Sequence, residues 1–131
     1  TPDELNEIFD VVLKVVAMIE REAAKNGLIH VDGKKEFALG PNRKVVLVDT
    51  FGTLDEDRWW DAEAYENVEC IELSKEFVRT HYIGTGHQAE LKQARDTGAV
   101  DPPIPELPQS VIDETAQLYA SMYERLTSQD F

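Results

Sequence analysis

Residues 28–49 read LIHVDGKKEFALGPNRKVVLVD, and this stretch decides the fold of the chain. Short apolar segments at 28–31, 36–39 and 44–49 surround a Gly-Pro-Asn-Arg run at 40–43. Side chains that alternate with a period of two, separated by turn-forming residues, are typical of antiparallel strands. We therefore expect a β meander whose last two strands form a hairpin.

Helical patterns lie on both sides of this meander. Apolar residues recur at helical spacing through 2–26, where Thr1 and Glu4 form a capping box and Gly27 ends the run. Three further helices are expected, at 74–84, 88–97 and 108–126.

The remaining segments are less regular. Residues 101–108 contain four prolines and should form an extended strap. Residues 49–61 are polar and rich in turn formers, which favours an ordered loop. Together these patterns predict one α+β domain over 1–131, an antiparallel meander packed with an N-terminal helix and C-terminal helices.

Composition limits the function classes. Twenty-six acidic residues against thirteen basic ones give a net charge of −13, which argues against nucleic acid and anionic membranes as partners. No apolar run is long enough to span a bilayer. The single cysteine, Cys70, excludes an internal disulfide and is expected to be a buried, inert thiol. These features and the absence of a signal-peptide pattern favour the cytoplasm.

The hairpin carries the most informative charges. An antiparallel pairing with a four-residue loop places Leu39 opposite Lys44 and Glu36 opposite Leu47. Lys34, Glu36 and Asp49 then share one face, with the two acids diagonal at ~7 to 8 Å between backbones. Two carboxylates at that spacing suit one divalent cation with oxygen ligands, such as Mg²⁺. A loop with an odd number of residues would turn Asp49 to the other face.

Each of these charged residues also has a simpler interpretation. The hairpin could be an exposed ribbon with a charged outer face. Arg58 could recognise a phosphate or carboxylate, or pair with Asp55 or Asp57 on the surface. Lys75 and Arg79 could form a small basic patch or be solvated separately.

Several segments, in order along the chain, resemble the C-terminal lobe of SAICAR synthetases. They are GLIHVDGKKEF at 27–37, VLVDTFGTLDEDRWW at 46–60, SKEFVR at 74–79 and the proline strap with its final helix. The resemblance covers nearly the whole chain, and the DTFGT form at 49–53 is similar to archaeal members of the family.

The resemblance implies a fold related to ATP-grasp and kinase-like enzymes, and a ligase of de novo purine biosynthesis. Members of the family use ATP as co-substrate, with Mg²⁺, to join L-aspartate to CAIR, giving SAICAR, ADP and phosphate. Catalysis of this kind depends on positioning and on charge neutralisation at a phosphoryl group.

Site residues follow from the resemblance by position. Glu36 and Asp49 would bind magnesium, while Lys34 would contact a phosphate or the activated carboxylate, with Asp32 beside it in the catalytic group. Three further residues would bind substrate: Asp55, Arg58 and Lys75. Thr50 stands where many bacterial members have a second acid, which leaves a second metal site open.

The family's N-terminal nucleotide-binding lobe has no counterpart in these 131 residues. The chain is therefore expected to be inactive without that lobe, whether it is a fragment, one chain of a split enzyme or a relic. The alternative is a noncatalytic interaction or ligand-binding module derived from the same fold. An uncovered apolar face would also allow a homo-oligomer.

Overall fold

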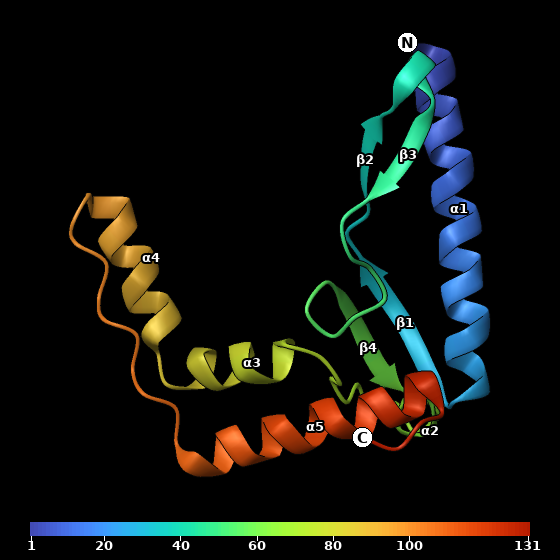
Figure 1. Cartoon of the computed structure of the whole chain (residues 1–131). Helices are drawn as coiled ribbons and strands as arrows, with labels where there is room; N and C mark the ends of the chain where they lie inside the picture. The colour runs from blue at the N-terminus through green and yellow to red at the C-terminus, as the bar shows by residue number, and fades with distance from the viewer.

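A long helix, α1 (Pro2–Lys25), runs beside two small antiparallel sheets (Figure 1). The structure is a computed structural model that describes residues 1–131. The predicted capping box is present, because the Thr1 side chain accepts from the backbone N–H of Glu4 and the Glu4 side chain reaches back to Thr1. Gly27, with φ of 65°, turns the chain out of the helix. The first predicted helix is thus confirmed.

The sheets are built from four short strands. β1 (Leu28–Gly33) pairs with β4 (Asp57–Asp61), and β2 (Glu36–Leu39) pairs with β3 (Val45–Val48). The prediction of a loop through 49–61 was wrong in its second half. Asp57 and Trp59 are buried and flank the exposed Arg58, so the segment has the alternation of a strand. The pattern was not recognised because one of the buried residues is an aspartate.

The predicted hairpin register was wrong by one residue. Glu36 lies opposite Val48 rather than Leu47, and Leu39 lies opposite Val45. Lys44 belongs to the turn, where its carbonyl accepts from the Gly40 N–H and its own N–H donates to Pro41. The turn therefore has an odd number of residues and includes η1 (Pro41–Arg43). By this register Glu36 and Val48 share a face, and a regular continuation of the strands would turn Asp49 to the other one.

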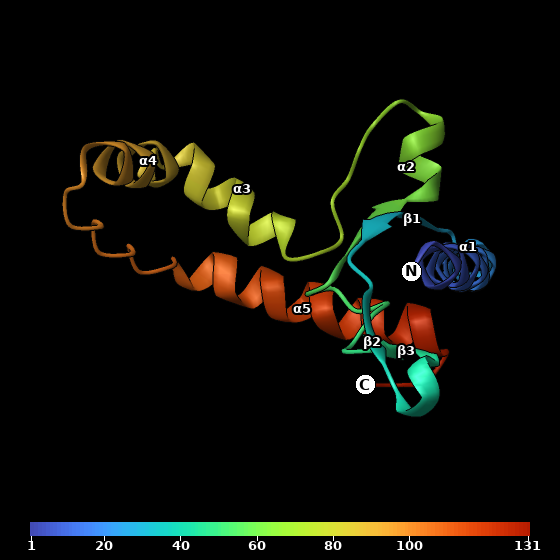
Figure 2. The ribbon, with the colours of Figure 1, turned by 90° about the horizontal axis from the view of Figure 1, so that it is seen from above.

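The second half of the chain is helical. It contains α2 (Ala62–Glu66), α3 (Glu76–Gly84), α4 (His87–Thr97) and α5 (Gln109–Thr127). The three predicted helices are confirmed, and residues 99–108 form the extended strap. In Figures 1 and 2, α3 and α4 project away from α1, and α5 runs back from the strap toward β4.

The hydrophobic core lies where the end of α1 meets β1, β4 and the end of α5. Its members are Ala23, Leu28, Leu54, Trp59 and Met122. The predicted inward face of α5 is correct at Leu118, Met122 and Leu126, but Ile112 and Tyr123 near it are exposed. The core therefore occupies one end of the molecule.

Much apolar surface remains uncovered. Only 10 of the 131 residues are buried, and the accessible surface is 9172 Å². A compact protein of this mass exposes about 7000 Å². Two sets of exposed apolar side chains stand out, Leu5, Phe9 and Leu13 on α1, and Leu39, Val46 and Val48 on the hairpin. Monomeric proteins rarely expose apolar surface of this extent.

The structure also bears on the predictions for the cysteine and for a membrane span. Cys70 is exposed, so the prediction of a buried thiol was wrong. None of the helices has both the length and the apolar character that crossing a membrane demands.

Arg125 joins the end of α5 to α1 and β4. Its guanidinium donates to the carbonyl oxygens of Asn26 and Gly27, at 3.1 and 2.8 Å, and to the Asp61 carboxylate at 3.1 Å. We expect Arg125→Ala to lower the free energy of unfolding by about 2 kcal/mol, because these acceptors lose a charged donor in a partly buried place. Urea denaturation would measure the loss.

Arg95 supplies the matched control. It pairs only with the exposed Asp101, so Arg95→Ala should change the free energy of unfolding by less than about 0.5 kcal/mol. Equal losses for the two variants would show that Arg125 contributes no more than a surface ion pair.

Candidate functional site

Four of the predicted site residues line one pocket. It has a volume of about 410 Å³ and lies between β1, the segment before β4 and the start of α3. Asp32, Lys34, Arg58 and Lys75 all contribute to its wall. The remaining lining residues are Gly33, Glu56, Glu76 and Arg79, so no apolar side chain takes part. The pocket is suited to a charged, strongly polar ligand.

Asp32 and Arg58 face each other across the β1–β4 sheet. They are cross-strand partners, and the guanidinium contacts both carboxylate oxygens, with Nε at 2.7 Å from Oδ1. This contact lowers the pKa of Asp32 and raises that of Arg58. Both side chains are about half exposed, at 55% and 46%. Arg58 therefore pairs with Asp32, not with Asp55 or Asp57, and a ligand carboxylate or phosphate could compete for the same planar fork.

Lys34 lies among three acids. Its ammonium group pairs with Glu36, which is the main reason that its pKa is raised, and the charges of Glu56 and Asp49 raise it further. Glu36 and Asp49 thus both act on Lys34, although the register would separate them on a regular ribbon. The strand is not regular at this point, because Asp49 has a left-handed φ of 69°.

A magnesium site at this place would depend on Glu36 and Asp49. No three acidic, histidine or cysteine side chains gather closely enough to enclose a metal ion. Glu36 is paired with Lys34, and the Asp49 carboxylate accepts from the Thr50 N–H at 2.9 Å. Mg²⁺ is commonly bound by one or two carboxylates and keeps waters or phosphate oxygens as its other ligands. Glu36 and Asp49 could hold a cation only in that open way.

Asp55 lies outside this pocket. Its carboxylate accepts from the Tyr119 hydroxyl at 2.8 Å, which attaches the loop before β4 to α5. Burial and this bond raise the pKa of Tyr119 to about 12. The structure therefore gives Asp55 a contact that positions the loop, and a role in substrate binding stays a prediction.

Lys75 and Arg79 extend the site along α3. Both line a second pocket of about 650 Å³ that reaches Tyr82, His87 and the strap. Arg79 also pairs with Glu76. The basic patch predicted from their spacing thus lies between two pockets.

Glu56 also lines the pocket, although it was not among the predicted site residues and lies in the segment expected to be an ordered loop. Its neighbour Arg58 could have drawn attention to it.

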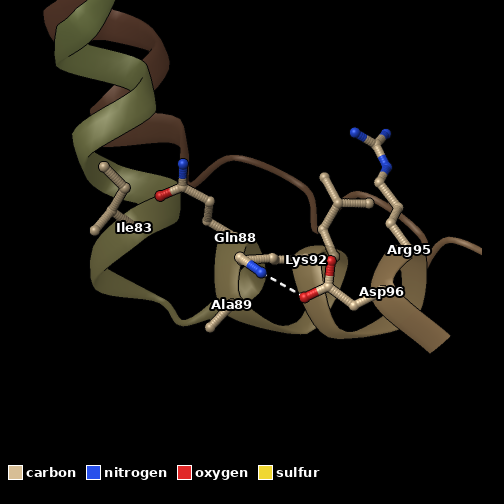
Figure 3. Close-up of a pocket in the computed structure, with 7 residues that line it drawn as sticks. Ile83, Gln88, Ala89, Lys92, Arg95 and Asp96 are labelled. Carbon is tan, nitrogen blue, oxygen red and sulfur yellow. Dashed lines mark hydrogen bonds and ion pairs between the residues drawn. The ribbon is translucent and has the colours of Figure 1, made fainter.

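A third pocket, of about 620 Å³, lies along α4 (Figure 3). Two of its charges satisfy each other, because Lys92 pairs with Asp96 one turn away on the same helix, and Arg95 pairs with Asp101 outside the pocket. Ile83 and Ala89 supply short apolar walls. Nothing in this groove brings reactive groups together.

The fold and the site define a class, an α+β unit with a pocket lined by charged side chains of both signs. A family model for SAICAR synthetase matches residues 1–95. The chain belongs to the SAICAR synthetase family, as its resemblance predicted.

Individual relatives agree with this membership. The chain is 48% identical over 129 residues to the phosphoribosylaminoimidazole-succinocarboxamide synthase of Thermoplasma acidophilum, covering 98% of this chain and 44% of the relative. A solved SAICAR synthetase (type 2) in complex with ADP matches with a TM-score of 0.64 at 25% identity, over 98% of this chain and 40% of that one.

A SAICAR synthase from Saccharomyces cerevisiae, solved with SAICAR, matches with a TM-score of 0.72 at 23% identity, over 96% of this chain and 39% of that one, and supports the fold alone. The predicted α+β fold and the archaeal likeness are confirmed. The chain spans less than half the length of these relatives.

Proposed function

We propose that the chain is the C-terminal lobe of an ATP-dependent ligase that joins L-aspartate to CAIR, giving SAICAR, ADP and phosphate. The observation that carries this is the 48% identity to the Thermoplasma acidophilum synthase over 98% of the chain. The related structure in complex with ADP supports a nucleotide ligand here. A cytoplasmic place in de novo purine biosynthesis belongs to the proposal.

In this proposal the residues of the pocket and the two acids of the hairpin have different roles, according to their charge. Glu36 and Asp49 would hold Mg²⁺, which neutralises charge on phosphoryl oxygens when it is bound. Lys34, now paired with Glu36, would contact a phosphate or the activated carboxylate as a point charge. Arg58 would exchange Asp32 for an anionic group of a substrate, with Lys75 beside it.

Activity would require a second polypeptide segment that binds the nucleotide. The uncovered surface supports this, since it exceeds that of a compact protein by roughly 2000 Å², and a standard interface buries about 800 Å² on each partner. The exposed side chains on α1 and the hairpin include several large apolar ones, as expected of a permanent interface.

ADP release in the presence of MgATP, CAIR and L-aspartate tests the proposal. The chain alone should turn over little, and a mixture with the complementary part of the Thermoplasma acidophilum relative should be active. Full activity of the chain alone would contradict the need for the other lobe. A stable complex with no turnover, detected by light scattering, would instead favour the second candidate, a noncatalytic interaction module.

The metal assignment has its own test in the active assembly. We expect Glu36→Ala with Asp49→Ala to lower the magnesium-dependent rate roughly a hundredfold, because the cation loses its protein ligands. Glu63→Ala with Glu66→Ala removes two exposed acids from α2 and should leave the rate unchanged. An unaltered dependence on magnesium in the first variant would defeat the assignment.

A further inference from the structure

Asp57, the first residue of β4, is a buried carboxylate with an unusual number of partners. Its side chain is 0% exposed. The Lys35 ammonium group lies at 2.9 and 3.1 Å from the two oxygens, and His30 Nε2 lies at 3.0 Å from Oδ2. The Gly52 backbone N–H donates to the same Oδ2 at 2.9 Å. Lys35 and His30 are themselves only 3% and 2% exposed.

These partners come from three separate segments. His30 is in β1, Lys35 directly precedes Glu36 at the start of β2, and Gly52 follows Asp49 by three residues. The β2–β3 ladder ends at the pair Glu36 and Val48. Strand pairing therefore stops before Asp49. Beyond that point the two arms of the hairpin, the segment that carries Lys35 and the segment that carries Gly52, are connected through Asp57.

The backbone is shaped around this carboxylate. Asp49 and Gly52 have φ values of 69° and 73°, so the loop turns back and aims the Gly52 N–H at Asp57. The ammonium group of Lys35 also lies 5.9 Å from the centre of the Phe51 ring, in the same loop. Both arms thus contact the same buried group.

We propose that Asp57 is a positioning residue that holds the arms bearing Glu36 and Asp49, so that both carboxylates meet one divalent cation. The inference rests on the proposed function for the identity of that site. It assigns a role to a buried network that touches no substrate in the scheme above.

Two double variants separate this role from general stability. Lys35→Met with Asp57→Leu removes the buried charges together and also removes the acceptor for Gly52. Lys35→Met with Asp57→Asn removes the same charges but keeps an oxygen for the Gly52 N–H and an amide donor for His30. Replacing both members of a buried pair avoids the unpaired charge that a single change would leave.

Mn²⁺ binding is the first readout. It is monitored through the electron paramagnetic resonance signal of the free ion. Carboxylate and water ligands suit Mn²⁺ as they suit Mg²⁺. We expect the Leu variant to bind Mn²⁺ at least tenfold more weakly than the wild-type chain, and the Asn variant to stay within about threefold. Arg43→Gln removes an ion pair with Glu4 at the far end of the same hairpin and should leave the affinity unchanged.

Amide hydrogen exchange is the second readout and needs no metal. Exchange in residues 50–56 should rise at least tenfold in the Leu variant, while α1 keeps its protection. Unchanged exchange or unchanged Mn²⁺ affinity in the Leu variant would overturn the positioning role, as would an equal loss in the Asn variant. If the wild-type chain does not bind Mn²⁺, both the positioning role of Asp57 and the metal assignment are overturned. This outcome differs from a loss of the positioning role alone, in which the wild-type chain still binds Mn²⁺.

Discussion

Trp59→Ala is expected to lower the free energy of unfolding by about 4 kcal/mol. Trp59 is 1% exposed and lies at the centre of the core, among Leu28, Leu54 and Met122. Its ring is also 5.0 Å from that of His30, and its indole N–H donates to the Thr53 carbonyl. Since only six apolar residues are buried in the whole chain, few neighbours can move to fill the cavity.

The adjacent tryptophan provides the control. Trp60 lies on the other face of β4, stacks on Tyr65 and donates to Glu72, but stays partly exposed. Trp60→Ala removes the same atoms and should cost roughly half as much, because part of that surface already meets water. Urea denaturation followed by circular dichroism compares the two without relying on tryptophan fluorescence. Equal costs would mean that the core is not centred on Trp59.

Local signals were enough to predict α1, α3, α4 and α5, but the short helix α2 was not predicted. Thr1, Glu4 and Gly27 delimit α1 through interactions with near neighbours, and the prolines of the strap exclude regular structure there. The hairpin register was predicted wrongly because of one residue, Lys44. Lys44 fits the alternation of a strand, but its carbonyl closes the turn with Gly40, and sequence alone does not show which of the two applies.

Some of the residues assigned to the site lie close together, while their roles stay predictions. Asp32, Lys34 and Arg58 do lie in one pocket with Lys75. Asp55 was assigned to substrate binding through the family resemblance, and its carboxylate accepts from Tyr119, which lies 64 positions away. Contacts over such separations depend on the packing of α5 and carry no local signal.

The buried network was hidden for a related reason. Lys35 and Asp57 each lie in a run of charged residues, and such runs are usually solvated. Their partnership spans 22 positions and becomes visible only when β1 and β4 pair. A buried ion pair therefore appeared in the sequence as two ordinary surface charges.

Gly33→Ala should destabilise the chain by about 3 to 5 kcal/mol through this network. A methyl group on Gly33 would lie 1.8 Å from Asp57 Oδ1 and 2.7 Å from Lys35 Nζ. The backbone of Gly33 is not in the left-handed region, so the cost is steric rather than conformational. The carboxylate would have to move, which leaves the buried Lys35 and His30 without their partner.

A control glycine and a double-mutant cycle make the result specific. Gly84→Ala meets no atom within 4 Å at the end of α3 and should be neutral or slightly stabilising in urea denaturation. In a chain that already carries Lys35→Met and Asp57→Ala, Gly33→Ala should cost less than about 1 kcal/mol, because the carboxylate that it strikes is gone. An undiminished cost in that background would place the clash elsewhere. A smaller cost of Gly33→Ala in that background would establish that position 33 lacks a side chain so that Asp57 can occupy the space between the two arms.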